Sequence, residues 1–426
     1  MRMPVVDQTL MVALQGYGWL PDQRRRSRDG VVQARVLGQR AVGLCGPDAA
    51  RFFYDENNVT RRTAIPEPVQ STLFGHGAVH TLDGEAHRVR KTMFMTLLTG
   101  PGVAGLVEQA EAAWDDAVAS WSPGQRVVLF DEASRVITRA VCRWAGLPLE
   151  DTEVPEVAAR LVALVDGFAT AGPRHWRARR ARAGLERRIA KLIDQVRSGA
   201  AAAPPESALA TIAEHRDASG EPLDSRVAAV EVLNVIRPTV AVCWFVAYSA
   251  HAMHLWPEHR EALQARRPGY AEAFTHEVRR FYPFAPFIGG RAVRDLTWQG
   301  QPIPSGTLVL LDLYGQNHDN LLWPDPYRFA PERFLDRHIG AYDLVPQGGG
   351  DPRTGHRCPG EQITIALLEA LVPRLADLDY DVPAQDLEIS LQRVPARPAS
   401  GVVIVPATTP STAADQPPAR QGTRSR

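Results

Sequence analysis

One cysteine stands in a loop whose composition suits a metal-bound sulfur. Cys358 lies in the run Gly-His-Arg-Cys-Pro-Gly-Glu at residues 355–361, after three glycines at 348–350 and before an amphipathic helix expected over 362–378. The free amides and the dipole at the start of a helix lower the pKa of a nearby thiol and favour the thiolate. Glycines also let the backbone approach a flat ligand closely. The alternative is a small buried residue without chemistry, which is the usual fate of a free cysteine.

Two motifs earlier in the chain could form an ion network. Glu277 and Arg280 lie three residues apart in a helix expected over 267–281, so their side chains share a face. Arg333 follows in the run Pro-Glu-Arg-Phe at 331–334. Each pair alone would more often be a solvent-exposed ion pair of little consequence.

The longest apolar segment contains two residues that oppose its folding. Arg237 and Pro238 interrupt a nearly all-apolar helix expected over 225–255. Proline inside a helix costs about 3 kcal/mol, and a buried guanidinium needs a counter-charge. Such a conflict is kept most easily where function requires it.

In this order the motifs resemble the cytochrome P-450 family. The resemblance runs from Asp7 to about Val405 and narrows to the fatty-acid peroxygenase branch. The narrowing rests on these stretches: Phe52–Tyr54, Ser71–Gly75, Thr81–His87, Arg90-Lys91, Ile236–Thr239 and Pro346–Gly350. It implies haem b with Cys358 as its axial thiolate ligand, and a buried network of Glu277, Arg280 and Arg333 beneath it. The fold it implies is a single domain with the haem between the distal long helix and the proximal cysteine loop.

The sequence departs from the ordinary monooxygenase pattern at two places. No Phe-Gly-x-Gly-x-Arg run precedes Cys358, and the long helix lacks the acid-alcohol pair that relays protons in reductase-driven relatives. We therefore expect hydrogen peroxide as the oxidant, with no redox partner. The guanidinium of Arg237 matches a carboxylate bidentately, so a long-chain fatty acid bound head first would itself supply the proton relay. Oxidation would fall on the α or β carbon, and Pro238 would open the helix on the oxygen side.

For Arg237 the alternative is an ion pair with a carboxylate of the protein itself. His80 stands just before Thr81-Leu82-Asp83-Gly84, where histidine in peroxygenase relatives is associated with decarboxylation to terminal alkenes and glutamine with hydroxylation. We expect both products. A loop histidine without a catalytic role is the alternative for His80.

The resemblance also suggests contacts to the haem and the substrate. Propionates need cationic or hydrogen-bonding partners when buried. The expected cofactor contacts are His87, Arg90, Lys91, Arg291, His356 and Arg357. Phe74 and Phe287 are expected beside the substrate tunnel or the haem edge, although a phenylalanine is more often plain core.

Composition restricts the other partners. The 48 basic and 48 acidic residues of this 426-residue chain leave no net charge to attract nucleic acid or a membrane surface. Four scattered cysteines without disulfide spacing favour a reduced, cytoplasmic protein. We expect no signal peptide and no stretch of membrane-spanning length.

Periodicity predicts a mainly α fold with small β-sheets. Apolar residues recur at spacings of three and four residues, which is typical of helices, in the ranges 103–121, 133–145, 154–169, 179–196, 225–255 and 267–281. Short strands are expected at 31–36, 40–44, 307–311 and 402–405, the first two as a hairpin. One domain over 1–405 and a disordered tail over 406–426 follow. The arginine-rich stretch 174–188 is expected on a solvated helix face.

Three other functions remain open at this point. A conventional monooxygenase would need a ferredoxin or flavoprotein reductase. A haem-binding sensor would respond to a ligand without turnover. A zinc site at His356 and Cys358 lacks a second pair of ligands at suitable spacing.

Overall fold

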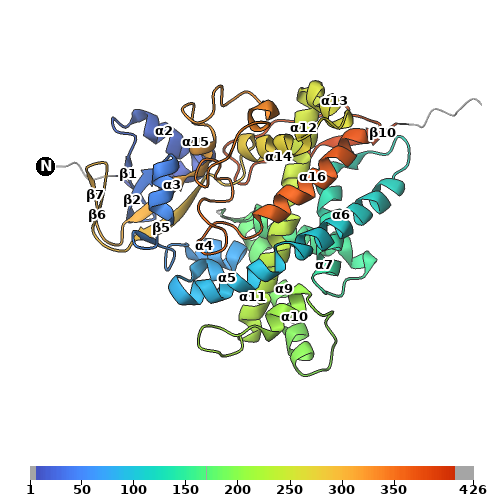
Figure 1. Ribbon diagram of the computed structural model, residues 1–426, viewed down its shortest axis with the longest axis horizontal. Helices are drawn as coiled ribbons and strands as arrows, with labels where there is room; N and C mark the ends of the chain where they lie inside the picture. Colours follow the sequence, from blue (N-terminus) through green and yellow to red (C-terminus); the bar gives the residue numbers. More distant parts are fainter. Residues whose placement is uncertain (1–5, 169, 408–426) are drawn as a thin grey trace, which may run out of the picture.

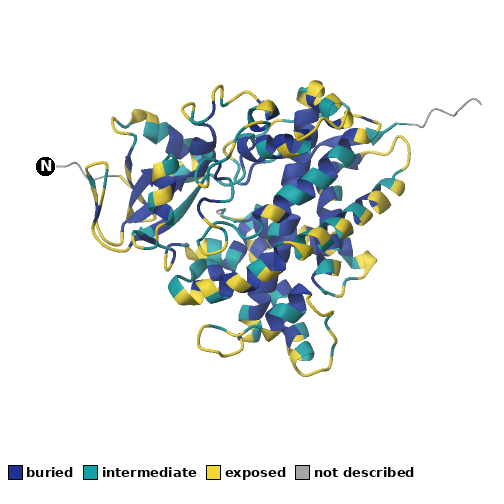
Figure 2. Ribbon diagram, in the orientation of Figure 1, coloured by how far each residue is buried: buried dark blue, intermediate teal, exposed yellow. Residues whose placement is uncertain are grey.

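Helices surround a core beside a smaller β-rich part in the computed structural model, which describes residues 6–168 and 170–407. Figure 1 shows the strands β1, β2 and β5 with the helices α2 and α3 on one side of the molecule, and the long helices on the other. Figure 2 shows buried residues along the inner faces of both parts. The largest apolar cluster joins helices throughout the helical part, and two smaller clusters flank the sheet.

The helices vary from single turns to 25 residues. The α-helices are α1 Thr9–Gln15, α2 Trp19–Arg26, α3 Pro47–Tyr54, α4 Glu67–Val69, α5 Gly84–Leu97, α6 Pro101–Ala119, α7 Leu129–Trp144, α8 Val154–Asp166, α9 Pro173–Arg197, α10 Ala208–Glu214, α11 Ser225–Val240, α12 Val242–Leu255, α13 Pro257–Gln264, α14 Tyr270–Phe281, α15 Leu313–Asn317 and α16 Glu361–Asp377. Short helical turns are η1 Gly16–Gly18, η2 Gln70–Phe74, η3 Val79–Thr81, η4 Asp151–Glu153 and η5 Pro331–Phe334.

The strands form three small sheets. They are β1 Val32–Val36, β2 Gln39–Leu44, β3 Val59–Thr60, β4 Val127–Val128, β5 Phe287–Ala292, β6 Leu296–Trp298, β7 Gln301–Ile303, β8 Leu308–Asp312, β9 Tyr380–Asp381 and β10 Val403–Pro406. The largest sheet has the order β1-β2-β8-β5-β3, with β2 and β8 parallel. This sheet pairs residues 41–60 with residues 291–311, so two segments far apart in the sequence fold together.

The long apolar segment forms α11 and α12, separated by a turn at Ala241. By length and composition the stretch Ser225–Leu255 could cross a membrane, with a mean hydropathy of 1.5, so the expectation that no such stretch exists was wrong. The protein buries 94% of its apolar window, which is typical of a core helix. This helix therefore carries Arg237 through the centre of the molecule.

The predicted mainly helical fold with small sheets is confirmed. Each predicted helix and strand is present, and β1 and β2 form the expected antiparallel hairpin. Helix α9 begins at Pro173, before the predicted start. The prediction missed its first turns because they carry arginines rather than a regular apolar stripe. Its Arg182 is buried, which corrects the expectation of a wholly solvated arginine face. Most of the predicted tail, from residue 408, lies outside the described residues.

Candidate active site

Arg237 is buried in α11 without an acidic partner among the described residues. It is 5% exposed, and its one hydrogen bond runs from Nη2 to Oδ1 of Asn234 at 3.2 Å. Its Nε atom is buried and has no partner. Burial, followed by repulsion from Arg182, lowers the pKa of Arg237 to about 9. The guanidinium is thus a cation that the protein buries without neutralising it.

Pro238 lies inside α11, and the helix ends two residues later. A proline cannot donate to the carbonyl oxygen four residues before it, and it clashes with the preceding turn. The helix nevertheless continues through Pro238 to Val240, and the break at Ala241 before α12 lies three residues farther on. The end of α11 thus lies close to Arg237, and the opening of the helix by Pro238 stays a prediction.

Phe74 and His80 lie beside Arg237. The rings of Phe74 and His80 are 4.3 Å apart between centroids, and the guanidinium carbon of Arg237 is 5.6 Å from the Phe74 centroid. The Nδ1 atom of His80 is buried without a partner. Burial, then the charge of Arg237, holds the pKa of His80 well below its ordinary value, so the imidazole is neutral at physiological pH.

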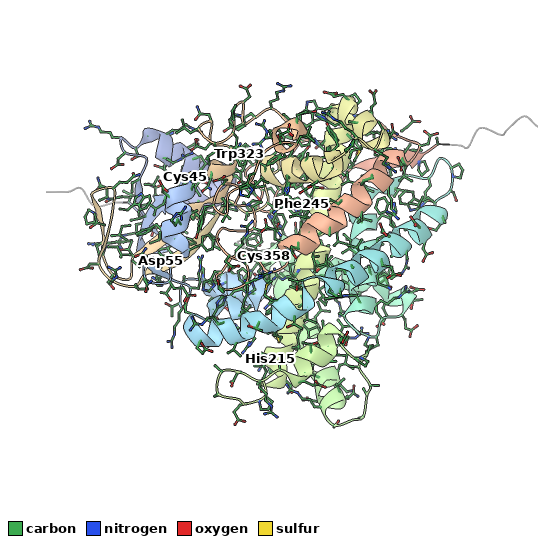
Figure 3. All side chains as sticks on the ribbon, viewed as in Figure 1. Cys45, Asp55, His215, Phe245, Trp323 and Cys358 are labelled. Atoms are coloured by element: carbon green, nitrogen blue, oxygen red, sulfur yellow. The ribbon has the colours of Figure 1, made fainter. Side chains whose placement is uncertain are left out.

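Cys358 lies near the centre of the molecule, just before α16 (Figure 3). Its backbone N–H donates to the carbonyl oxygen of Gln347 at 3.0 Å, and the Lys91 ammonium donates to the carbonyl oxygen of Arg357 at 2.5 Å. The glycine run approaches the protein's own side chains, because a Cβ at Gly348 would collide with the Tyr54 hydroxyl. These contacts fix the loop around the thiol.

Burial raises the pKa of the Cys358 thiol, and this effect exceeds the lowering by Lys91 and by the N–H of Gly360. The backbone N–H near the helix start does lower this pKa as predicted, but burial outweighs its effect. A bound cation would favour the thiolate of Cys358 further. The loop thus suits a metal ligand better than a free nucleophile.

Glu277, Arg280 and Arg333 form the predicted ion network. Arg280 donates from Nε and Nη2 to the two Glu277 oxygens, both at 2.7 Å, and Arg333 Nε lies 3.2 Å from Glu277 Oε2. Glu277 and Arg280 are fully buried. The network joins α14 to the turn η5 and the segment before it.

A second buried pair escaped the sequence analysis. Arg279 is paired with Glu361 at the start of α16, and it donates to Gln347 Oε1 at 2.9 and 3.1 Å. Arg357 donates from Nε to the other Glu361 oxygen at 2.5 Å. Both arginines therefore hold the ends of the cysteine loop. The sequence offers one signal for this pair, the two consecutive arginines at 279–280. Adjacent residues on a helix point in different directions, so Arg279 binds Glu361 while Arg280 binds Glu277.

Comparisons with known proteins agree with this arrangement. The family model described as Cytochrome P450 matches residues 262–375. Cytochrome P450SP alpha (CYP152B1) is 42% identical, with a TM-score of 0.91 over 94% of this chain and 98% of that chain. Cytochrome P450EX alpha (CYP152N1), solved with myristic acid, is 39% identical, with a TM-score of 0.90 over 95% and 97%. Cytochrome P450 OleT, solved with arachidonic acid, is 36% identical, with a TM-score of 0.92 over 95% and 97%.

The chain belongs to the cytochrome P450 family. Its solved neighbours place it among the CYP152 enzymes, and this confirms the family that the sequence motifs suggested. Membership implies a haem with a cysteine thiolate ligand.

The buried polar atoms of this P450 fit a haem with its propionates. Nδ1 of His87 and Nη2 of Arg61 are buried without hydrogen-bond partners. Arg61 also donates from Nη1 to the carbonyl oxygen of Gly289 at 3.0 Å, and its guanidinium stacks on Phe53 at 4.1 Å. An anionic group that accepts from Arg61 and His87 would satisfy both. Arg61 was missed because it lies outside every motif.

Three arginines assigned to the haem have donors engaged elsewhere. Arg90 pairs with Glu231 at 2.6 Å. Arg291 donates to Thr63, Gly306 and Gln39 near the surface. Arg357 is held by Glu361 and by the carbonyl oxygens of Ala341 and Gly350. Arg291 and Arg357 therefore have fewer donors available for a propionate than Arg61, whereas Arg90 keeps one buried, unpartnered nitrogen, Nε.

Within the described residues, His356 does not form the suggested zinc site with Cys358. Nε2 of His356 lies 3.3 Å from Asp83 and 3.5 Å from Glu56, and its ring stacks on His87 at 3.9 Å. Ligand atoms of Glu56, His87 and His356 fall within 4.8 Å of one another, and Cys358 is not in this group. The described residues therefore give no support to a zinc site through the cysteine.

Phe287 is the first residue of strand β5, and its ring contacts helix α2. It packs edge-on against Trp19 at 5.9 Å. Phe284, three residues earlier, packs against Trp244 and Phe245 at the start of α12, at 6.1 and 5.2 Å. Phe284 thus lies next to the start of α12, and Tyr282 of the same segment stacks on Tyr248 farther along that helix.

Proposed function

We propose that this P450 uses hydrogen peroxide to oxidise long-chain fatty acids at the α or β carbon, producing hydroxy acids and terminal alkenes. The buried, unneutralised guanidinium of Arg237 is the observation that carries the proposal. Two solved neighbours contain myristic and arachidonic acid, which supports the substrate class. The haem, bound through Cys358, would supply the oxidising chemistry. The free cysteines agree with a reducing cytoplasmic location.

Arg237 binds and orients the substrate in this proposal. Its guanidinium has one hydrogen bond within the described residues, so its remaining N–H donors can hold a carboxylate in a fork. The single positive charge matches the single negative charge of a fatty acid. With the acid head fixed, the α and β carbons are the nearest to it, and such orientation can supply about 7–11 kcal/mol at best.

The proton relay is then the substrate's carboxylate. Thr239 is the hydroxyl nearest to Arg237 in the sequence of α11, and it donates to the carbonyl oxygen of Val235 at 2.9 Å. Glu231, the acid of this helix, is engaged with Arg90. Neither side chain is free to pass a proton, so a carboxylate held by Arg237 would take that role.

His80 acts beside the same carboxylate. Its neutral imidazole holds one proton and presents an unpartnered Nδ1 atom, so it can accept or donate at the substrate head. Phe74 packs against one face of the ring and excludes water there. This position favours a role in choosing between decarboxylation and hydroxylation.

The test is product analysis after the purified haem protein is incubated with myristic acid and hydrogen peroxide alone. Hydroxylated acid and a shortened terminal alkene are expected. Products that form only with an electron donor and a redox partner would instead establish a conventional monooxygenase. A spectral response to the fatty acid without any product would establish a haem-binding sensor.

A further inference from the structure

Glu231 lies at the centre of a buried polar chain that the proposed mechanism does not use. It is 0% exposed, and its carboxylate accepts three hydrogen bonds. Oε1 accepts from Arg90 Nη1 at 2.6 Å and from the Val79 backbone N–H at 2.8 Å, and Oε2 accepts from Asn234 Nδ2 at 3.0 Å. Three donors from α5, η3 and α11 therefore meet at one carboxylate.

The chain continues from Glu231 to the substrate-binding arginine. Glu231, Asn234 and Arg237 are spaced three residues apart on α11, so they follow one face of the helix. An ionised carboxylate only accepts hydrogen bonds and a guanidinium only donates them. The Asn234 amide consequently has one orientation that satisfies both neighbours, with Nδ2 toward Glu231 and Oδ1 toward Arg237.

Glu231 also binds the backbone next to His80. The Val79 N–H that it holds belongs to the first residue of η3, and His80 is the next residue. The same carboxylate thus fixes the backbone beside His80 and, through Asn234, one end of the Arg237 guanidinium. Two groups on different elements are set relative to each other by one buried side chain.

Arg90 gives this group of hydrogen-bonded side chains a net positive charge, which suits the binding of a carboxylate. Arg90 and Glu231 neutralise each other, which leaves the charge of Arg237 uncompensated. One positive charge is then available for one carboxylate. Without Arg90, the Glu231 carboxylate would be a buried anion close to the site that has to bind another anion.

We propose that Glu231 is a positioning residue that sets Arg237 and His80 relative to one another, and so controls both fatty-acid affinity and the choice of product. This inference rests on the proposed function, because it names how that site is held. Glu231 acts through the groups that it contacts, the Val79 backbone and the Asn234 side chain.

The main variant is Glu231→Gln in the haem-loaded protein. Glutamine keeps the shape and one acceptor, but its NH2 group faces Nδ2 of Asn234, so Asn234 must turn its amide and release Arg237. We expect the dissociation constant of myristic acid, measured by calorimetry, to rise on the order of tenfold. The ratio of alkene to hydroxy acid should change as well. Unchanged affinity and product ratio would overturn the proposal.

A double-mutant cycle separates positioning from general damage. If Glu231 acts through Arg237, then Glu231→Gln changes affinity by less than about twofold when Arg237 is already alanine. A tenfold effect in both backgrounds would show that Glu231 acts through overall structure and would overturn the inference. The matched control is Asp166→Asn, which removes another carboxylate that is paired with two arginines, Arg174 and Arg393. Asp166 has no hydrogen bond to Glu231, Asn234 or Arg237 among the described residues. It should leave affinity unchanged.

Asn234→Ala provides a second route if Glu231→Gln does not retain haem. It breaks the link to Arg237 but keeps the Val79 anchor, so affinity should fall while the product ratio changes less. Retained affinity in Asn234→Ala would also overturn the proposal. Wild-type protein that binds myristic acid without oxidising it would contradict the proposed function alone, because the affinity measurements would still decide the role of Glu231.

Discussion

The ring of His80 packs against the ring of Phe74, with centroids 4.3 Å apart and planes inclined by 37°. The Arg237 guanidinium lies over the same phenylalanine, 5.6 Å from its centroid. Phe74 therefore contacts both a buried cation and a neutral imidazole. Removing either polar group should affect different properties of the enzyme.

Replacing His80 with glutamine should shift the products from alkene toward hydroxy acid. Glutamine cannot exchange a proton as imidazole does, and it lacks the ring that packs on Phe74. We expect the alkene fraction from myristic acid to fall on the order of fivefold, as measured by gas chromatography. The control is His76→Gln, at an exposed position, which should not change the ratio. An unaltered ratio in His80→Gln would make His80 a loop residue without a catalytic role.

Replacing Arg237 with alanine should weaken fatty-acid binding by roughly 30-fold or more, the usual cost of truncating one partner of a buried charged pair. Haem content should be retained. The substrate-free variant should unfold at the same or a higher temperature, because the wild-type guanidinium is buried without a counter-charge. Calorimetry and thermal unfolding measure the two effects. Arg180→Ala on the exposed face of α9 is the control, and full affinity in Arg237→Ala would contradict the carboxylate fork.

Arg61 and Arg291 offer a direct comparison of two candidate haem partners. Arg61→Ala should speed haem loss to an acceptor protein, since it removes a buried guanidinium with an unpartnered nitrogen near His87. Arg291→Ala should have little effect, because its donors bind Thr63, Gly306 and Gln39. Arg61→Lys keeps the charge and should recover part of the retention. Faster loss from Arg291→Ala than from Arg61→Ala would reverse the assignment.

The sequence predicted the elements that are determined by interactions between residues close together in the chain. Regular apolar spacing located α11 and α12, and the order of motifs located Glu277, Arg280 and Cys358. Helix α5 was missed because it turns polar residues inward, among them His87 and Lys91, so its buried face is not an apolar stripe. Periodicity detects a helix only when its buried side is hydrophobic.

Long-range partners were the other limit. The motifs suggested Arg291 for a propionate, yet pairing of β5 with β3 places Arg61 beside Gly289 with a free nitrogen. The role of Arg90 depended in the same way on Glu231, which is 141 residues away in the chain. Spacing along a chain indicates which residues share a face, and packing decides which partners they meet. The cytoplasmic location stays a prediction.

Glu277→Gln should destabilise the fold by about 3–5 kcal/mol, because it leaves Arg280 buried with its charge uncompensated. Urea unfolding of the haem-loaded protein measures the change. The matched control is Glu85→Gln, which removes a solvent-exposed partner of Arg88 and should cost less than about 1 kcal/mol. Equal effects of the two substitutions would show that the buried network contributes no more than a surface pair.

Stability should fall as the pH drops from about 6.5 toward 4, in part through His318. Burial, then the charge of Arg280, lowers the pKa of His318 to about 4, and its Nδ1 donates to the Tyr314 carbonyl oxygen at 2.9 Å. The unfolded chain, with the ordinary histidine pKa, binds a proton in this window that the folded protein excludes. Each pKa unit contributes about 1.4 kcal/mol, so His318 accounts for on the order of 3 kcal/mol.

His318→Gln isolates this contribution, because glutamine keeps a donor for Tyr314 but does not titrate. Burial raises the pKa of Asp312 to about 7, which opposes the histidine effect in the wild type, so the comparison must be between slopes rather than single values. The free energy of unfolding in urea should depend on pH less steeply in the variant, by up to about one proton between pH 6 and pH 5. Parallel slopes would show that His318 already carries its proton in the folded protein or stays exposed to solvent. A shallower slope identifies a buried histidine, held neutral beside Arg280, as one source of acid sensitivity in this fold.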